Sequence, residues 1–135
     1  MAQREPDPQG APVRRFTDPA YRPLAPDLAG IRREIDRIDD AVVKLLAERA
    51  MYVKDAARFK RDAFQVSAPA RQAEVFARVR AQADRLMPGF NGGFEGLPDV
   101  VEAAYRSLVA GYIACEQNYF GQTEDVTPPP NEHKT

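Results

Sequence analysis

The sequence has few of the residues on which metal-dependent and nucleophilic catalysis most often rely. Its 135 residues include one histidine, His133, one cysteine, Cys115, and no tryptophan. His133 lies in a proline-rich tail, which argues against a histidine-based metal site or catalytic triad. A single cysteine cannot form an internal disulfide, and we expect Cys115 to be a small buried residue of a helix. No metal site is therefore predicted.

Charge and hydropathy exclude further classes of protein. Lysine and arginine number 19 against 20 acidic residues, so no basic excess points to nucleic acid. No apolar run reaches the ~18 residues of a membrane span, and the first residues lack the apolar stretch of a secretory signal. With 44% hydrophobic and 29% charged residues, the composition is that of one globular domain. We expect a cytoplasmic enzyme or binding module without nucleic-acid or membrane partners.

Proline is concentrated at the two ends of the chain. Residues 1–26 contain six of the twelve prolines, and three consecutive prolines lie within residues 121–135. Such segments cannot form helices and contain too few apolar residues to pack. We predict a disordered N-terminal extension over 1–26, a helical domain over 27–120 and a disordered tail over 121–135.

The longest regular pattern begins after Asp27, a plausible N-cap. Apolar residues recur in steps of three and four, as on one face of an α-helix, at Leu28, Ile31, Ile35, Ile38, Val42, Leu45, Val53 and Ala56. We expect a helix of about 35 residues, roughly 50 Å long. One chain of this size cannot cover such a face from end to end, so a second copy is the expected partner.

Two shorter helices are predicted beyond a connecting loop. Ser67 and Pro69 indicate the start of one, and Pro98 with Asp99 the first turn of the other. Between them, residues 87–97 form a glycine-rich turn that lacks the sequence context of a phosphate-binding loop. The predicted fold is therefore all-α, with three helices, one very long, in an intertwined homodimeric bundle.

The long helix carries cations where core residues are expected. Arg49 falls on the apolar line, and Lys60, eleven residues later, returns to nearly the same face. Arg32 is rotated well away and would meet a different neighbour. A buried guanidinium needs an anionic partner, which could be a structural carboxylate or a ligand.

The other two helices add a cation and a carboxyl group. Arg71 lies in the first turn of the second helix, where it is either a solvated side chain or an anion ligand. Tyr112 and Glu116, four residues apart, share one face of the third helix. Fixed cations without a nucleophile or metal suit a small dianionic substrate that needs positioning and charge stabilisation.

Four segments, in order and at matching spacing, resemble a known family. IRREIDRID, LLAERAMYVKDAARFK, APARQ and YIACEQNYF are similar to the all-helical chorismate mutases, and the AARFK and APAR pieces resemble the isochorismate-pyruvate lyase branch. The resemblance covers about residues 27–120. It implies a domain-swapped dimer with two shared sites and a cofactor-free pericyclic reaction on chorismate or isochorismate, both small dicarboxylates.

The resemblance also implies roles for individual residues. Arg49 would grip a substrate carboxylate from the same chain, and Arg32 would be supplied across the dimer. Lys60 would hydrogen-bond the ether oxygen of the breaking C–O bond, where negative charge develops, and Arg71 would help to close the site. Apart from the resemblance, we expect Tyr112 to bind the substrate, because it shares a helix face with Glu116.

The third helix departs from the pattern of the family. Many members have glutamine as the second donor to the ether oxygen, but the ungapped register places Glu116 there, with Gln117 facing about 100° away. Only a protonated Glu116 can donate a hydrogen bond. We therefore expect turnover to fall as Glu116 ionises with rising pH.

Several functions remain open at this point. The broadest is chorismate mutase, which forms prephenate. Close behind is isochorismate-pyruvate lyase, which forms salicylate and pyruvate through cleavage of the same ether bond. A mutase for an amino-substituted chorismate is also conceivable. From another class, the chain could be a non-catalytic helical dimer with a binding or regulatory role, although four cations would contribute little to dimerisation alone.

Overall fold

The computed structural model describes residues 3–89 and 91–128, and every regular element in those ranges is helical. Three long helices account for most of the chain, as predicted for an all-α fold. The elements in order are α1 (Leu28–Ala56), a 3-10 turn (Ala57–Phe59), α2 (Ala63–Ser67), α3 (Pro69–Leu86), a 3-10 turn (Met87–Gly89) and α4 (Leu97–Phe120). His133, and with it the end of the predicted tail, lies outside the described residues.

The first helix begins where the sequence indicates but ends early. The Asp27 carboxylate accepts a hydrogen bond from the Gly30 amide at 2.8 Å, which confirms the predicted N-cap. The α-helix stops at Ala56 after 29 residues, not the expected ~35, and tightens into the 3-10 turn. Ala57, only 2% exposed, is buried in that turn, and Lys60 follows in extended conformation. The chain therefore leaves the helix axis just before Lys60.

The connection to the next long helix contains an element that the sequence pattern did not reveal. Helix α2 is capped by Asp62, whose carboxylate accepts from the Gln65 amide at 2.9 Å. The helix ends at Ser67, and the cap residue that follows, Ala68, has a φ of 45°, in the left-handed region. Pro69 then opens α3, as predicted, but Ser67 is not its cap, because Ser67 is the last residue of α2.

The core of the single chain lies between α3 and α4. Its buried apolar side chains are Ala57, Val66, Val75, Phe76, Val79, Ala83 and Val109. Pro98 and Asp99 occupy the first turn of α4, in agreement with the prediction. Cys115 was expected to be buried, but it is exposed, as is Leu86 at the end of α3. Cys115 precedes buried Glu116 and is turned about 100° from it, away from the core.

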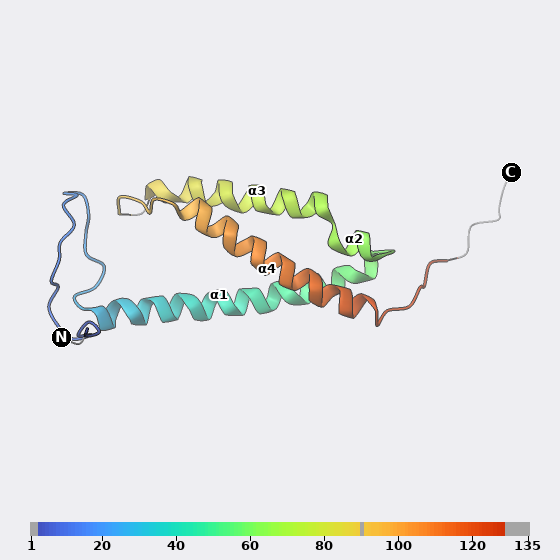
Figure 1. Ribbon diagram of the computed structural model, residues 1–135, viewed down its shortest axis with the longest axis horizontal. Helices are drawn as coiled ribbons and strands as arrows, with labels where there is room; N and C mark the ends of the chain where they lie inside the picture. The colour runs from blue at the N-terminus through green and yellow to red at the C-terminus, as the bar shows by residue number, and fades with distance from the viewer. Residues whose placement is uncertain (1–2, 90, 129–135) are drawn as a thin grey trace.

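The other two long helices, α3 and α4, leave much of α1 uncovered. Figure 1 shows α1 and α3 running along opposite sides of the molecule, with α4 crossing from the end of α3 to the end of α1. Of the 29 residues of α1, only Gly30 is buried. Ile35 and Ile38 on its apolar face remain 50% and 49% exposed. No described helix is both long and apolar enough to cross a membrane.

The N-terminal segment has neither helix nor strand over residues 3–26. It loops from the start of α1 toward the α3–α4 connection (Figure 1). There the backbone N–H of Arg22 donates to the Asn91 side-chain oxygen, and the Asn91 amide donates to the Arg22 carbonyl, both at 2.7 Å. This pair ties the segment to the turn between α3 and α4.

Candidate active site

Five of the six site residues predicted from the sequence line one cavity of about 300 Å³. The end of α1, the start of α3 and the second half of α4 form its walls, with α2 between them. The predicted residues in its lining are Arg49, Lys60, Arg71, Tyr112 and Glu116. These positions are separated by up to 67 residues in sequence, so only the fold brings them together.

Lys60 and Glu116 form an ion pair within this cavity. The Lys60 ammonium donates to Glu116 Oε2 at 3.1 Å, and the two side chains are 22% and 5% exposed. The extended backbone at Lys60 directs it away from the end of α1 toward α4. A charge-assisted hydrogen bond at this depth holds the ammonium beside Glu116.

Arg49 is held by aromatic rings rather than by a carboxylate. Its guanidinium carbon lies 4.9 Å from the centroid of Tyr112 and 5.9 Å from that of Tyr105, within the range of cation–π attraction. The Tyr112 hydroxyl donates to the Leu46 carbonyl, which fixes the ring on α1. Among the described residues no carboxylate lies within 4.0 Å of Arg49. Its hydrogen-bonding capacity is therefore available to an anion.

Arg71 lines the cavity but also forms an ion pair outside it. It pairs with Glu74 one turn later on α3, and the two side chains are 57% and 67% exposed. An exposed pair of this kind contributes at most ~1 kcal/mol. An anion in the cavity can therefore compete with Glu74 for Arg71.

Arg32 does not reach this cavity in the same chain. It is exposed on α1, seventeen residues before Arg49, a rise of roughly 25 Å along the helix. No rotamer of an arginine spans that distance. Within one chain the structure therefore separates Arg32 from the other five predicted residues.

The lining contains three cations, from Arg49, Lys60 and Arg71, and one carboxylate, from Glu116. Two positive charges are thus in excess if all four groups are ionised. Cations held around a small, partly enclosed volume can bind a dianion and stabilise charge that develops during its reaction. Among the described residues, no three His, Cys, Asp or Glu side chains gather as potential metal ligands.

Other residues line the cavity but were not predicted as site residues from the sequence. They include Tyr52, Val53, Ala56, Ser67, Gln72 and Ile113. Val53 and Ala56 belong to the apolar face of α1, and Gln72 follows Arg71. Their positions in the sequence could therefore have indicated that these three residues lie near the site. Tyr105, which supports Arg49, lies seven residues before Tyr112 on the same face of α4. Its role required the structure, because the sequence does not show which helix faces it.

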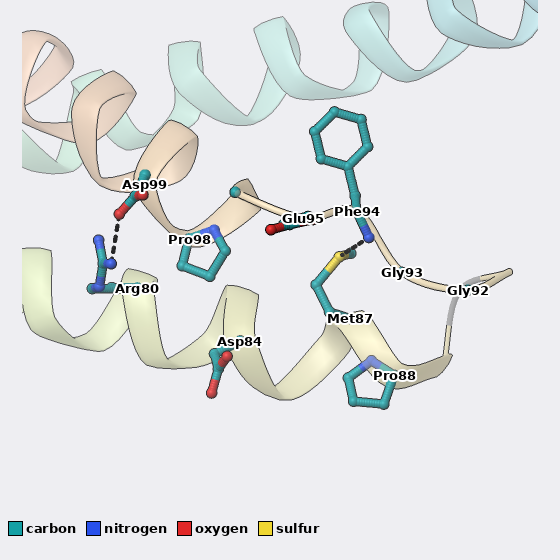
Figure 2. A pocket seen from close by; sticks show the side chains of 11 residues that line it. Arg80, Asp84, Met87, Pro88, Gly92, Gly93, Phe94, Glu95, Pro98 and Asp99 are labelled. Atoms are coloured by element: carbon teal, nitrogen blue, oxygen red, sulfur yellow. Dashed lines mark hydrogen bonds and ion pairs between the residues drawn. The ribbon is translucent and has the colours of Figure 1, made fainter.

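A second, larger hollow of about 510 Å³ lies at the α3–α4 turn, far along α4 from Lys60. Figure 2 shows Arg80 reaching from α3 to Asp99, a contact of 2.5 Å. Arg80 also pairs with Glu102 at 3.1 Å, and hydrogen bonding from Arg106 holds the pKa of Glu102 below its usual value. Arg80 and Asp99 of the lining are thus paired with each other, while Asp84 and Glu95 give this hollow an excess of negative charge. None of the predicted site residues lines it, and the smaller cationic cavity is the better candidate site.

An all-helical fold with a cationic cavity is the arrangement expected for the chorismate mutase class. Residues 31–117 match the model of the family described as chorismate mutase type II, and the chain belongs to that family. This range includes α1 from Ile31, α2, α3 and α4 as far as Gln117, and therefore every wall of the cavity.

Three relatives support the assignment. The chain is 35% identical over 96 residues to an isochorismate pyruvate lyase of Pseudomonas aeruginosa, covering 71% of this chain and 87% of that protein. It is 39% identical over 54 residues to a chorismate mutase of Methanocaldococcus jannaschii, covering 39% of this chain and 54% of that protein. A bifunctional chorismate mutase/prephenate dehydratase of Aquifex aeolicus is 30% identical over 92 residues, which are 67% of this chain but 24% of that protein. Family and relatives together support an enzyme.

Proposed function

We propose that this protein rearranges chorismate to prephenate without a cofactor. One observation carries the proposal: Lys60 lies beside Glu116 at 3.1 Å in a cavity that also presents Arg49 and Arg71. A pericyclic rearrangement needs no nucleophile. It needs a folded substrate conformer and stabilisation of the oxygen that gains charge as the C–O bond breaks.

Each cation has a distinct task in this proposal. Arg49 binds one substrate carboxylate, and its stacking on two tyrosine rings fixes the direction of its donors. Arg71 leaves Glu74 and closes on the substrate. Lys60 donates to the ether oxygen, an interaction that strengthens as charge develops there and therefore lowers the barrier.

Glu116 is the second group proposed to contact the ether oxygen. As a carboxylate it binds Lys60 and repels a substrate oxygen, whereas as a neutral acid it donates to that oxygen. Protonation of Glu116 would also release Lys60 from the ion pair. Both effects favour reaction when Glu116 carries a proton.

We further propose that two copies form an intertwined dimer with shared sites. The uncovered apolar face of α1 requires a partner, because a helix with one buried residue in 29 gains little stability from its own chain. The outer face of α4 offers small, exposed residues against which a large apolar face can pack closely: Ala103, Ser107, Ala110, Gly111 and Ala114. In such a dimer, Arg32 of one copy completes the site of the other.

The lyase reaction is the second candidate, favoured by the 35% identity to the Pseudomonas protein. Product analysis separates the two. Purified protein is given chorismate and isochorismate separately between about pH 5 and 8, with the Lys60→Ala variant as control. Prephenate as the main product supports the mutase, and dominant salicylate supports the lyase. Neither product would contradict both and direct attention to an amino-substituted chorismate.

The cytoplasmic location is part of this proposal and is not deduced from the fold. Cell fractionation with an antibody to the native protein tests it. Recovery in the membrane or extracellular fraction would contradict it.

A further inference from the structure

Helix α2 connects two of the cationic site residues, Lys60 before it and Arg71 after it. With five residues it is too short to be stable as an isolated helix. Its side chain Val66, 1% exposed, anchors it to the core, and the Asp62 carboxylate caps its first turn. Further contacts to α3 and α4 must define how it lies on the cavity wall.

Two glutamine side chains provide those contacts. Gln117 Nε2 on α4 donates to the Ala63 carbonyl at 3.0 Å and lies 3.5 Å from Ser67 Oγ. Gln72 Nε2 on α3 donates to the Ser67 carbonyl at 2.6 Å. The first and last residues of α2 are thus attached to α4, and its last residue is attached to α3 as well.

We propose that Gln117 is a positioning residue, which fixes α2 on α4 and thereby sets where Lys60 and Arg71 meet the substrate. The argument rests on the proposed function for the identity of that substrate. Glu116 and Gln117 are consecutive on α4 and turned about 100° apart. One binds the Lys60 side chain, and the other holds the helix that follows Lys60, so α4 grips this segment at two points.

The consequence concerns precision. Lys60 has extended backbone and a long flexible side chain, so its own conformation does not fix the ammonium. A displacement of ~1 Å at a reacting group can cost about 10²-fold in rate. Fixing α2 removes much of this freedom before substrate binds.

The test replaces Gln117 by methionine, which keeps the length of the side chain but removes its donor. Gln122→Met, at an exposed position just beyond α4, is the matched control. Amide hydrogen exchange is followed at Gln65, Val66 and Ala68, whose N–H groups bond within α2 and its cap. We expect about fivefold to tenfold faster exchange in Gln117→Met, the loss for one hydrogen bond, and no change in the control.

Kinetics on the preferred substrate supply the second readout. Gln117→Met is expected to lower kcat by roughly tenfold and to raise KM less, because the position of Lys60 matters most in the transition state. Gln117→Lys restores a donor of similar reach and is expected to recover slow exchange. Faster exchange with unchanged kcat, or unchanged exchange in Gln117→Met, would overturn the positioning role.

A third variant loosens α2 through a residue outside α4, so that an effect of α2 can be separated from an effect of the substitution in α4. Asp62→Ala removes the cap of α2 without touching α4, and we expect the same changes in exchange and kcat as for Gln117→Met. If Asp62→Ala accelerates exchange but kcat stays at the parent value, the position of α2 does not control the reaction and the inference is wrong. Because exchange needs no substrate, failure of the proposed reaction with every substrate is recognised separately from failure at Gln117.

Discussion

Lys60 and Glu116, 56 residues apart in sequence, meet at 3.1 Å in the candidate site. The pair joins the end of the first long helix to the last helix and is largely shielded from water. It also combines the proposed donor to the ether oxygen with the proposed pH-dependent group. The proposed stabilisation of the ether oxygen and the proposed pH dependence therefore both depend on this contact. Substitutions of Lys60 and Glu116 can test each of them separately.

The first prediction concerns turnover. Lys60→Ala removes a preorganised donor from the developing charge and is expected to lower kcat by ~10²–10³. Steady-state kinetics with chorismate measure the loss. Lys44→Ala, at an exposed position of α1, is the matched control and should retain parent activity. A Lys60→Ala enzyme with near-parent kcat would contradict the role of Lys60.

The second prediction concerns stability. Lys60→Met leaves Glu116 buried without its donor and is expected to lower the free energy of unfolding by about 1–3 kcal/mol. Lys60→Met combined with Glu116→Gln removes the stranded charge and should regain part of that loss while turnover stays low. Urea unfolding of the parent, the single variants and the double variant measures the coupling. Additive effects would show that the pair does not interact in solution.

The third prediction concerns pH. Protonated Glu116 donates to the substrate and releases Lys60, so kcat is expected to rise as pH falls and to decline as Glu116 ionises. Lys60, Arg49, Arg71 and Tyr112 line the same cavity as Glu116, and the pH profile is measured between about pH 5 and 8. In Glu116→Gln, an amide that donates at every pH, the profile should be flat over this range. A flat profile in the parent enzyme would remove the idea.

The fourth prediction concerns the shared site. Arg32→Ala and Arg49→Ala should each be nearly inactive as homodimers. Exchanging subunits between equal amounts is expected to restore about one quarter of parent activity, because half of the dimers are mixed and each mixed dimer has one intact site. The mixture is assayed after partial denaturation and refolding, with each variant refolded alone as control. No recovery would mean that both arginines act from the same chain or that no exchangeable dimer forms.

Local features of the fold were predictable because they depend on residues close together in the chain. The Asp27 cap, Pro69 at the start of α3 and Pro98 in the first turn of α4 are set by backbone hydrogen bonding over a few residues. The errors lie where packing overrides such patterns. Burial of Ala57 against the rest of the chain tightens the end of α1, and α2 takes Ser67 from the start of α3.

The sequence by itself determined the all-helical class and, through its resemblance to the family, which cations to examine. Helical periodicity is a short-range property. It predicted that Arg49 lies on the apolar face of the first long helix and that Tyr112 and Glu116 share one face of the last helix. Only the tertiary structure decided that Glu116 holds Lys60, that tyrosine rings support Arg49, and that Arg32 is too far to join them. These relationships depend on turns that fold one helix onto another. The spacing of residues along one helix does not determine which other helix packs against it.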